Sequence, residues 1–96
     1  MARQALFKIR TAISHGMYDM TQHASEEMAE DKLDIVDVET SIRNGRLMRS
    51  EKDDPRGTRY TVYGTGADRK TPVGTVGRFA KTGRYLIITV YKVTEG

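Results

Sequence analysis

The chain has two histidines, and one of them, His23, falls in the first turn of an expected helix within DMTQHASEEMAEDKL, residues 19–33. A helix N-terminus presents free backbone N–H groups and the positive end of the helix dipole, so it attracts phosphate. The same field favours the neutral imidazole, which can serve as a general base. The alternative is a structural histidine whose ring packs on a sheet and bonds a backbone carbonyl, and the residue type by itself favours that alternative.

Two expected strands carry further polar side chains at alternating positions. Arg59, Thr61 and Tyr63 share one face of the first strand. An arginine there can hold a phosphate in a bidentate pair, and a tyrosine can stack on a base or donate a proton. Thr89 and Tyr91 share one face of the last strand. The commoner role of such residues is a cross-strand pair, worth a few tenths to about 1 kcal/mol.

Several other chemistries lack the residues that they need. The absence of cysteine excludes disulfides, thiolate nucleophiles and cysteine-based zinc sites. His23 and Glu27 have i, i+4 spacing, but no third ligand lies at a helpful distance in sequence. GTGADRKTPVG has glycines without a Walker lysine–serine pair or a following helix, and no G-x-S-x-G elbow occurs. The acids of residues 26–31 are typical of a solvated helix face. We therefore expect neither a metal nor a cofactor.

The composition is that of one soluble domain. Ninety-six residues suffice for a single core, and 38% hydrophobic with 30% charged residues is a globular balance. The longest apolar run, YLIITVY, is far shorter than the roughly 20 residues of a spanning helix. Charges interrupt MARQALFKIR, where a secretory signal would be apolar. We expect a cytoplasmic protein that does not associate with membranes.

The net charge of +3 is distributed unevenly along the chain. Residues 1–54 hold 8 Lys or Arg against 11 Asp or Glu, whereas residues 55–96 hold 8 against 2. The basic half points to a polyanion such as RNA or to an acidic partner protein. Its candidates for contacting RNA are Arg56, Tyr63, Arg78 and Lys92. The alternative is that lysine and arginine keep the edges of a sheet soluble.

Apolar residues at helical spacing predict three helices in the first half of the chain. The first spans residues 2–14 and ends at Gly16. Thr21 caps the second, and the third runs from an N-cap at Asp34 to Asn44, where NG ends it. The core-facing residues are Leu6, Ile9 and Ile13 in the first helix, Ala24 and Met28 in the second, and Ile35, Val38 and Ile42 in the third.

From residue 46 the apolar period changes to two, which is typical of strands. Four strands are expected, in RLMRSEK, TRYTVYG, TPVGTVGRFA and RYLIITVYKV, and MYDM is expected to be a short extended segment or turn. Alternation in the last strand places Leu86, Ile88 and Val90 on one face, and Ile87, Thr89 and Tyr91 on the other. We expect that strand to lie centrally, with helices on its aliphatic side.

These elements predict an α+β fold in a single domain, residues 1–96. The helical part is about residues 2–45 and the sheet part about residues 46–93. The helices should pack on one face of an antiparallel sheet of about four strands.

The order of HASEEMAEDKLDIVDVETSIRNGRL, DDPRGTRYTVYG and YLIITVYK resembles a bacterial family of domains of unknown function. Its hallmarks are a helix that begins H-A-x-x-x-M, a second helix that ends in N-G, an R-Y strand pair and a terminal I-T-V-Y. The resemblance covers roughly residues 19–93. The family is similar to the RelE, HigB and BrnT toxins, small proteins that cleave or block RNA. This similarity implies a RelE-like fold whose active surface is the sheet face opposite the helices.

The resemblance also implies a candidate catalytic set, because the family's recurrent polar positions fall on His23, Arg59, Thr89 and Tyr91. A toxin of this kind is a metal-independent endoribonuclease that uses the RNA 2′-hydroxyl as its nucleophile. His23 would then be the base, and Arg59 would hold the phosphate. Tyr91 would be the acid or a positioning group, and Thr89 would orient one of these side chains.

The chain also departs from this pattern. Many family members carry arginines in the second helix, where Glu27 and Asp31 stand here. Two other functions therefore stay open. One is a non-catalytic module that binds RNA, or an acidic partner such as a cognate antitoxin, through the same sheet face. The other is an oligomerising scaffold in which Ile87 and Tyr91 pack between subunits.

Overall fold

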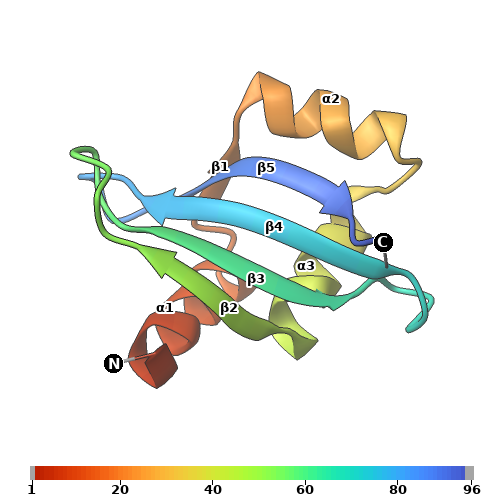
Figure 1. Cartoon of the computed structure of the whole chain (residues 1–96), viewed down its shortest axis with the longest axis horizontal. Coiled ribbons are helices and arrows are strands. Elements are labelled where there is room, and N and C mark those ends of the chain that lie inside the picture. Colours follow the sequence, from red (N-terminus) through yellow and green to blue (C-terminus); the bar gives the residue numbers. More distant parts are fainter. Residues whose placement is uncertain (1, 95–96) are drawn as a thin grey trace.

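The computed structural model describes the backbone of residues 2–94 and the side chains of residues 4–94. Its elements in chain order are α1 (Ala2–Ser14), β1 (Tyr18–Met20), α2 (Gln22–Glu30), α3 (Ile35–Asn44), β2 (Arg46–Glu51), β3 (Arg59–Thr65), β4 (Pro72–Phe79) and β5 (Tyr85–Lys92). Figure 1 shows α1 and α3 beneath the sheet and α2 alongside β5. The predicted α+β class is confirmed for these residues, although strand β1 lies within the part predicted to be helical.

The sheet has five strands rather than four, in the order β1-β5-β4-β3-β2. Strand β1 is the one that sequence reasoning treated as an extended segment or turn, and it pairs parallel to β5. Three residues are too few to show an alternating pattern, so this strand is defined by its partner. Arg84 fixes it, since its guanidinium bonds both the Asp19 carboxylate and the Tyr18 carbonyl.

The helix boundaries follow the predicted capping residues. Gly16 has the left-handed φ of 69° that allows the chain to turn after α1. The Thr21 hydroxyl accepts the Ala24 N–H at 3.1 Å at the start of α2. Asp34 and Asp37 form a reciprocal capping box at the start of α3. The Asn44 side chain ends α3 and pairs with both backbone groups of Thr65, which ties the helix to the end of β3.

The core lies between the sheet and the helices. Most of the predicted helical core residues are buried or packed against buried residues, and Ile35, the first residue of α3, is the exception at 36% exposed. Gly64 on β3 faces α3, and a Cβ there would overlap the Ser41 carbonyl oxygen. The helix therefore rests directly on the strand at this point. The buried hydrophobic residues are Ile9, Ala12, Ile13, Ala24, Leu33, Val38, Ile42, Val62, Val73, Tyr85, Ile87 and Val90.

The predicted facing of β5 is confirmed for Val90 and for Thr89 with Tyr91. It is wrong for Leu86 and Ile87, because a β-bulge interrupts the alternation. Gly77 of β4 pairs with Ile87, but the next β4 residue, Val76, pairs with Thr89, so Ile88 has no partner in that register. Ile87 and Val90 consequently share the buried face, three residues apart. The bulge turns Thr89 to the opposite face from Ile87.

The predicted solvated face of α2 is also partly wrong, since two of its acids bond the exposed edge of β5. A Glu27 carboxylate oxygen accepts the Val90 N–H at 3.2 Å, and Asp31 accepts the Lys92 N–H at 2.9 Å. Strand β1 is too short to cover this part of β5. The carboxylates thus take the place of a neighbouring strand and leave these edge amides satisfied.

We expect Glu27→Ala to lower the free energy of unfolding by about 1–3 kcal/mol, because the part-buried Val90 N–H would lose its acceptor. Urea denaturation followed by circular dichroism measures this. Glu30→Ala is the matched control on the exposed side of the same helix and should change stability by less than about 0.5 kcal/mol. Equal effects of the two substitutions would contradict the bonding role of Glu27.

Candidate functional site

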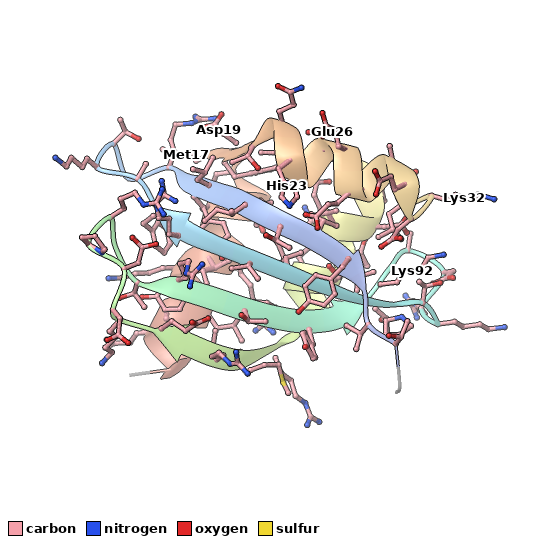
Figure 2. All side chains as sticks on the ribbon, turned by 45° about the horizontal axis from the view of Figure 1, so that its top comes forward. Met17, Asp19, His23, Glu26, Lys32 and Lys92 are labelled. Carbon is pink, nitrogen blue, oxygen red and sulfur yellow. The ribbon has the colours of Figure 1, made fainter. Side chains whose placement is uncertain are left out.

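The sheet face opposite α1 and α3 carries polar and aromatic side chains from four strands. We call it the open face, and its cross-strand registers define its members. They are Arg46, Arg49 and Glu51 on β2, Arg59, Thr61 and Tyr63 on β3, Gly74, Val76 and Arg78 on β4, and Leu86, Thr89 and Tyr91 on β5. Figure 2 shows this face turned toward the viewer, with α2 along its upper border.

Two tyrosines meet across a glycine toward one end of this face, where β2 begins and β5 ends. Tyr63 and Tyr91 are the register partners of Gly74 on its two sides. Their rings are nearly perpendicular, with centroids 6.1 Å apart, and the Tyr91 hydroxyl donates to the Tyr63 hydroxyl at 3.2 Å. A Cβ on Gly74 would lie 2.6 Å from the Tyr91 ring, so the glycine is what lets this ring cross β4.

Tyr91 is held in its neutral form. Burial and the hydrogen bond to Tyr63 raise the pKa of Tyr91 to about 12, while the positive charge of Arg49 acts in the opposite direction. At neutral pH the Tyr91 hydroxyl is therefore protonated. It can donate a proton but cannot act as a phenolate base. Because Tyr91 donates its hydrogen bond to Tyr63, the Tyr63 hydroxyl proton is the one free to reach a ligand.

His23 lies at the border of the open face. Its Nε2 atom is 3.3 Å from Glu27 Oε1, the same oxygen that accepts the Val90 N–H. The Glu27 carboxylate thus links the imidazole to the β5 backbone at Val90, the residue before Tyr91. The His23 side chain is 67% exposed. Figure 2 shows His23 on the side of α2 toward β5, while Glu26 points outward. Of the predicted catalytic residues, Thr89 and Tyr91 thus share the open face of β5, and His23 lies on the neighbouring helix α2.

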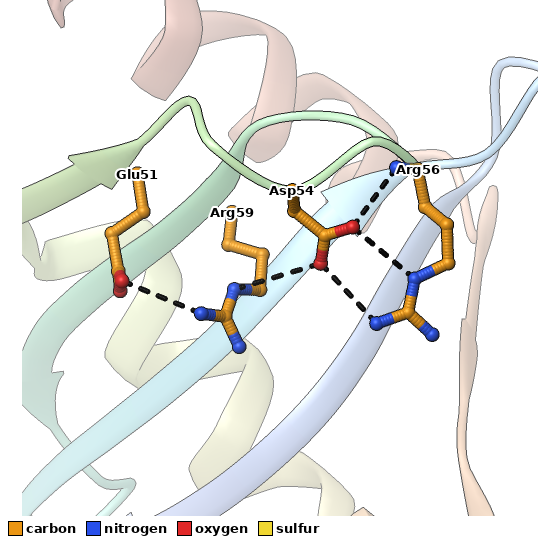
Figure 3. Close-up of polar contacts among 4 residues, drawn as sticks. All are labelled: Glu51, Asp54, Arg56 and Arg59. Carbon is orange, nitrogen blue, oxygen red and sulfur yellow. Dashed lines mark hydrogen bonds and ion pairs between the residues drawn. The ribbon is translucent and has the colours of Figure 1, made fainter.

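Arg59 lies apart from this group, in a row of alternating charges (Figure 3). Its guanidinium contacts Glu51 at 3.3 Å and Asp54 at 3.8 Å, and Asp54 also bonds Arg56. The hydrogen bonds from Arg56 hold the pKa of Asp54 below its usual value. Four residues of strand separate Arg59 from Tyr63, about 13 Å. Both Arg59 and Arg56 are therefore already paired with carboxylates.

The described arginines fall into two groups by partner. Arg10, Arg56, Arg59 and Arg84 each bond a carboxylate or a backbone carbonyl. Among the residues whose side chains the structure describes, the other five have no ion pair and no side-chain hydrogen bond. They are Arg43, Arg46, Arg49, Arg69 and Arg78. Three of these five lie on the open face.

Arg49 is the residue that sequence reasoning missed. Plain alternation in RLMRSEK would place it on the same face as Leu47, toward the helices. A register shift between the two residues instead pairs Arg49 with Thr61 and turns it to the open face. No pattern in the sequence marks this bulge. Of the predicted RNA contacts, Tyr63 and Arg78 lie on the open face, whereas Lys92 is exposed at the end of β5.

Two further observations concern the described part of the chain. Residues 2–94 contain no group of three or more His, Asp or Glu side chains that would hold a metal ion. None of the helices there is long and apolar enough to cross a membrane.

Comparison with known proteins identifies a family for most of the chain. A family model described as Domain of unknown function (DUF4258) matches residues 20–92. The match spans α2, α3 and all strands from β2 to β5. No curated protein and no solved structure matches the chain. The chain therefore belongs to this family of domains of unknown function.

Proposed function

We propose that this member of the DUF4258 family acts on single-stranded RNA through its open face, as a RelE-like, metal-independent endoribonuclease. The observation that carries the proposal is the placement of unpaired arginines. Arg46 pairs with Tyr63 across β2 and β3, and Arg49 lies close enough to Tyr91 to act on it electrostatically, while Arg78 lies on the same face four residues along β4 from Gly74. An arginine that is not paired with a carboxylate of the protein is available to bind a phosphate, and a tyrosine ring can stack on an unpaired base.

Arg49 is the phosphate ligand in this proposal. The residue implied by the family pattern, Arg59, would have to give up its pairs with Glu51 and Asp54 before it bound a phosphate. Arg49 has no such pair and lies close enough to Tyr91 for its charge to oppose the rise in the Tyr91 pKa. It is thus an available cation beside the aromatic pair.

The cleavage step needs a base, a cation and an acid. His23 takes the proton of the RNA 2′-hydroxyl, and the 2′-oxygen forms a bond to phosphorus as the bond to the 5′-oxygen breaks. Glu27 lies beside Nε2 and favours a proton there, which leaves Nδ1 as the acceptor. A tyrosine hydroxyl at the Tyr63–Tyr91 pair gives its proton to the leaving oxygen. The products are a 2′,3′-cyclic phosphate and a 5′-hydroxyl.

We expect Arg49→Gln to weaken binding of a short fluorescein-labelled single-stranded RNA by about three- to tenfold at low salt. The slope of log K against log salt concentration should become shallower by about 0.7, the value for one lost phosphate contact on a single strand. Fluorescence anisotropy over a series of salt concentrations measures both quantities.

Lys81→Gln is the matched control for this experiment, because it removes the same charge from the exposed turn between β4 and β5. It should leave the salt slope unchanged. If the wild-type protein does not bind RNA at low salt, or if both variants bind as the wild type does, the open face is not an RNA site.

A non-catalytic binding module is the second candidate function. It is favoured by the high exposure of His23, since a catalytic base usually works in a site that excludes water. It predicts salt-sensitive binding to RNA or to an acidic partner protein, such as an antitoxin, without turnover. The scaffold alternative loses one of its two residues, because Ile87 is 0% exposed within the single chain and is not available for a subunit contact.

A further inference from the structure

A hollow of about 710 Å3 lies where the end of α3 meets the start of β2 and the end of β3. Its lining includes Thr40 and Arg43 of α3, Arg46 of β2, Tyr63 and Thr65 of β3, and Arg69 of the turn that follows. Its volume falls within the range of roughly 300–1,000 Å3 that is usual for small-ligand sites. Tyr63 and Arg46 belong both to this hollow and to the open face. The two are therefore continuous.

The charged residues that line the hollow are all basic. Three of its eight lining residues, Arg43, Arg46 and Arg69, are arginines, and none of the eight is acidic. None of these three arginines has an ion pair or side-chain hydrogen bond among the described residues. Like charges gathered in one place raise the energy of the protein, and a bound anion would offset that energy.

Asp68, the acid next to Arg69 in sequence, forms its hydrogen bonds with other residues of the turn. Asp68 accepts hydrogen bonds from the Thr71 hydroxyl and from the backbone N–H groups of Lys70 and Thr71. These bonds, with that from the Thr71 hydroxyl first, lower the pKa of Asp68 to about 2. The Asp68 carboxylate thus stabilises the turn and does not pair with Arg69, which lines the hollow.

Arg69 also occupies a backbone conformation that does not suit its residue type. Its φ is 62°, in the left-handed region where glycine and asparagine are favoured. An arginine here adds strain to the turn, and although its backbone N–H bonds the Gly66 carbonyl, its side chain forms no hydrogen bond or ion pair with the described residues. A long cation at this position is understandable if its side chain binds a ligand.

We propose that this hollow binds a phosphate group of the RNA strand, next to the nucleotide that contacts Tyr63 on the open face. The inference rests on the proposed function, and it adds a second phosphate position at the end of the β2–β3 pair. Arg43 and Arg69 reach the phosphate from two sides, and Arg46 joins this position to Arg49 along β2. A free inorganic phosphate has the same chemistry, so the experiment must separate the two sources.

The first measurement uses RNA and the double variant Arg43→Gln, Arg69→Asn. Glutamine keeps the helix propensity of α3, and asparagine tolerates the left-handed φ, so both changes remove charge without unfolding the turn. The salt slope of RNA binding should become shallower by about 0.7, with affinity reduced three- to tenfold. Lys70→Gln is the control in the same turn, since Lys70 does not line the hollow.

The second measurement titrates inorganic phosphate into the wild-type protein while the arginine Nε–H signals are followed by NMR. Saturable shifts at Arg43, Arg46 and Arg69, without a shift at the paired Arg56, support an anion site in the hollow. If phosphate binds there but RNA does not bind the protein at all, the proposed function fails and the hollow is a free-phosphate site. If RNA binds the wild type and the double variant with the same salt slope, the inference is overturned while the proposed function stands.

Discussion

Substitution of His23 by alanine is expected to slow RNA cleavage in EDTA by on the order of 10²- to 10⁴-fold, the usual contribution of a general base. The proton acceptor would be lost, whereas the arginines and tyrosines of the open face would be kept. Cleavage of a long single-stranded RNA by purified protein, followed on denaturing gels with and without ribosomes, measures the rate. EDTA is included because the proposed step uses no metal ion.

The second histidine supplies the control. His15 follows the end of α1, is exposed, and is not part of the open face. His15→Ala should therefore cleave RNA at the wild-type rate. RNA that stays intact with both the wild type and the His23→Ala variant would rule out the enzyme. The salt-dependent binding of the Arg49→Gln variant would then decide between a non-catalytic RNA-binding module and no action on RNA.

Substitution of Gly64 by alanine is expected to destabilise the fold by about 3 kcal/mol, at the upper end of the usual range for overpacking. The added Cβ would overlap the Ser41 carbonyl oxygen, which belongs to the backbone of α3 and cannot rotate away as a side chain would. It would also lie 2.6 Å from the Asn44 side-chain oxygen that accepts the Thr65 N–H. The helix must shift to make room. Urea denaturation measures the change as a lower midpoint.

Thr65→Ala, one residue along the same strand, is the control for this effect. The backbone bonds of Thr65 to Asn44 do not depend on its side chain, so the change should stay within about 1 kcal/mol, the span of strand propensities. A Gly64→Ala protein that is as stable as the control would mean that α3 and β3 can separate without loss. In that case the close approach would not be a determinant of the fold.

Local signals in the sequence were sufficient for the helices and for most of the sheet. Capping residues such as Thr21 and Asp34 act on backbone groups three residues away, so their effect can be read from the chain itself. The four long strands also show their period directly. Strand β1 has no such signal, because its three residues exist as a strand only through pairing with β5.

The candidate site was predictable in part. The rarity of histidine and the family pattern singled out His23, and alternation put Tyr63 on the face of Arg59 and Thr61. The pairing of Arg59 with Glu51 and Asp54 was not visible, because it depends on the register of β2 with β3 and on the path of the loop between them.

The sequence by itself determined the α+β class, the helix ends and the presence of a basic second half, since each depends on residue type or short-range periodicity. Only the tertiary structure decided which side chains share the open face. The register shift at Leu47/Arg49 reverses the alternation and turns Arg49 to the side of Tyr63. The shift at Val76/Gly77 buries Ile87 with Val90 and leaves Leu86 on the same face as Thr89 and Tyr91. A bulge arises from how two strands fit together, so neither strand records it alone.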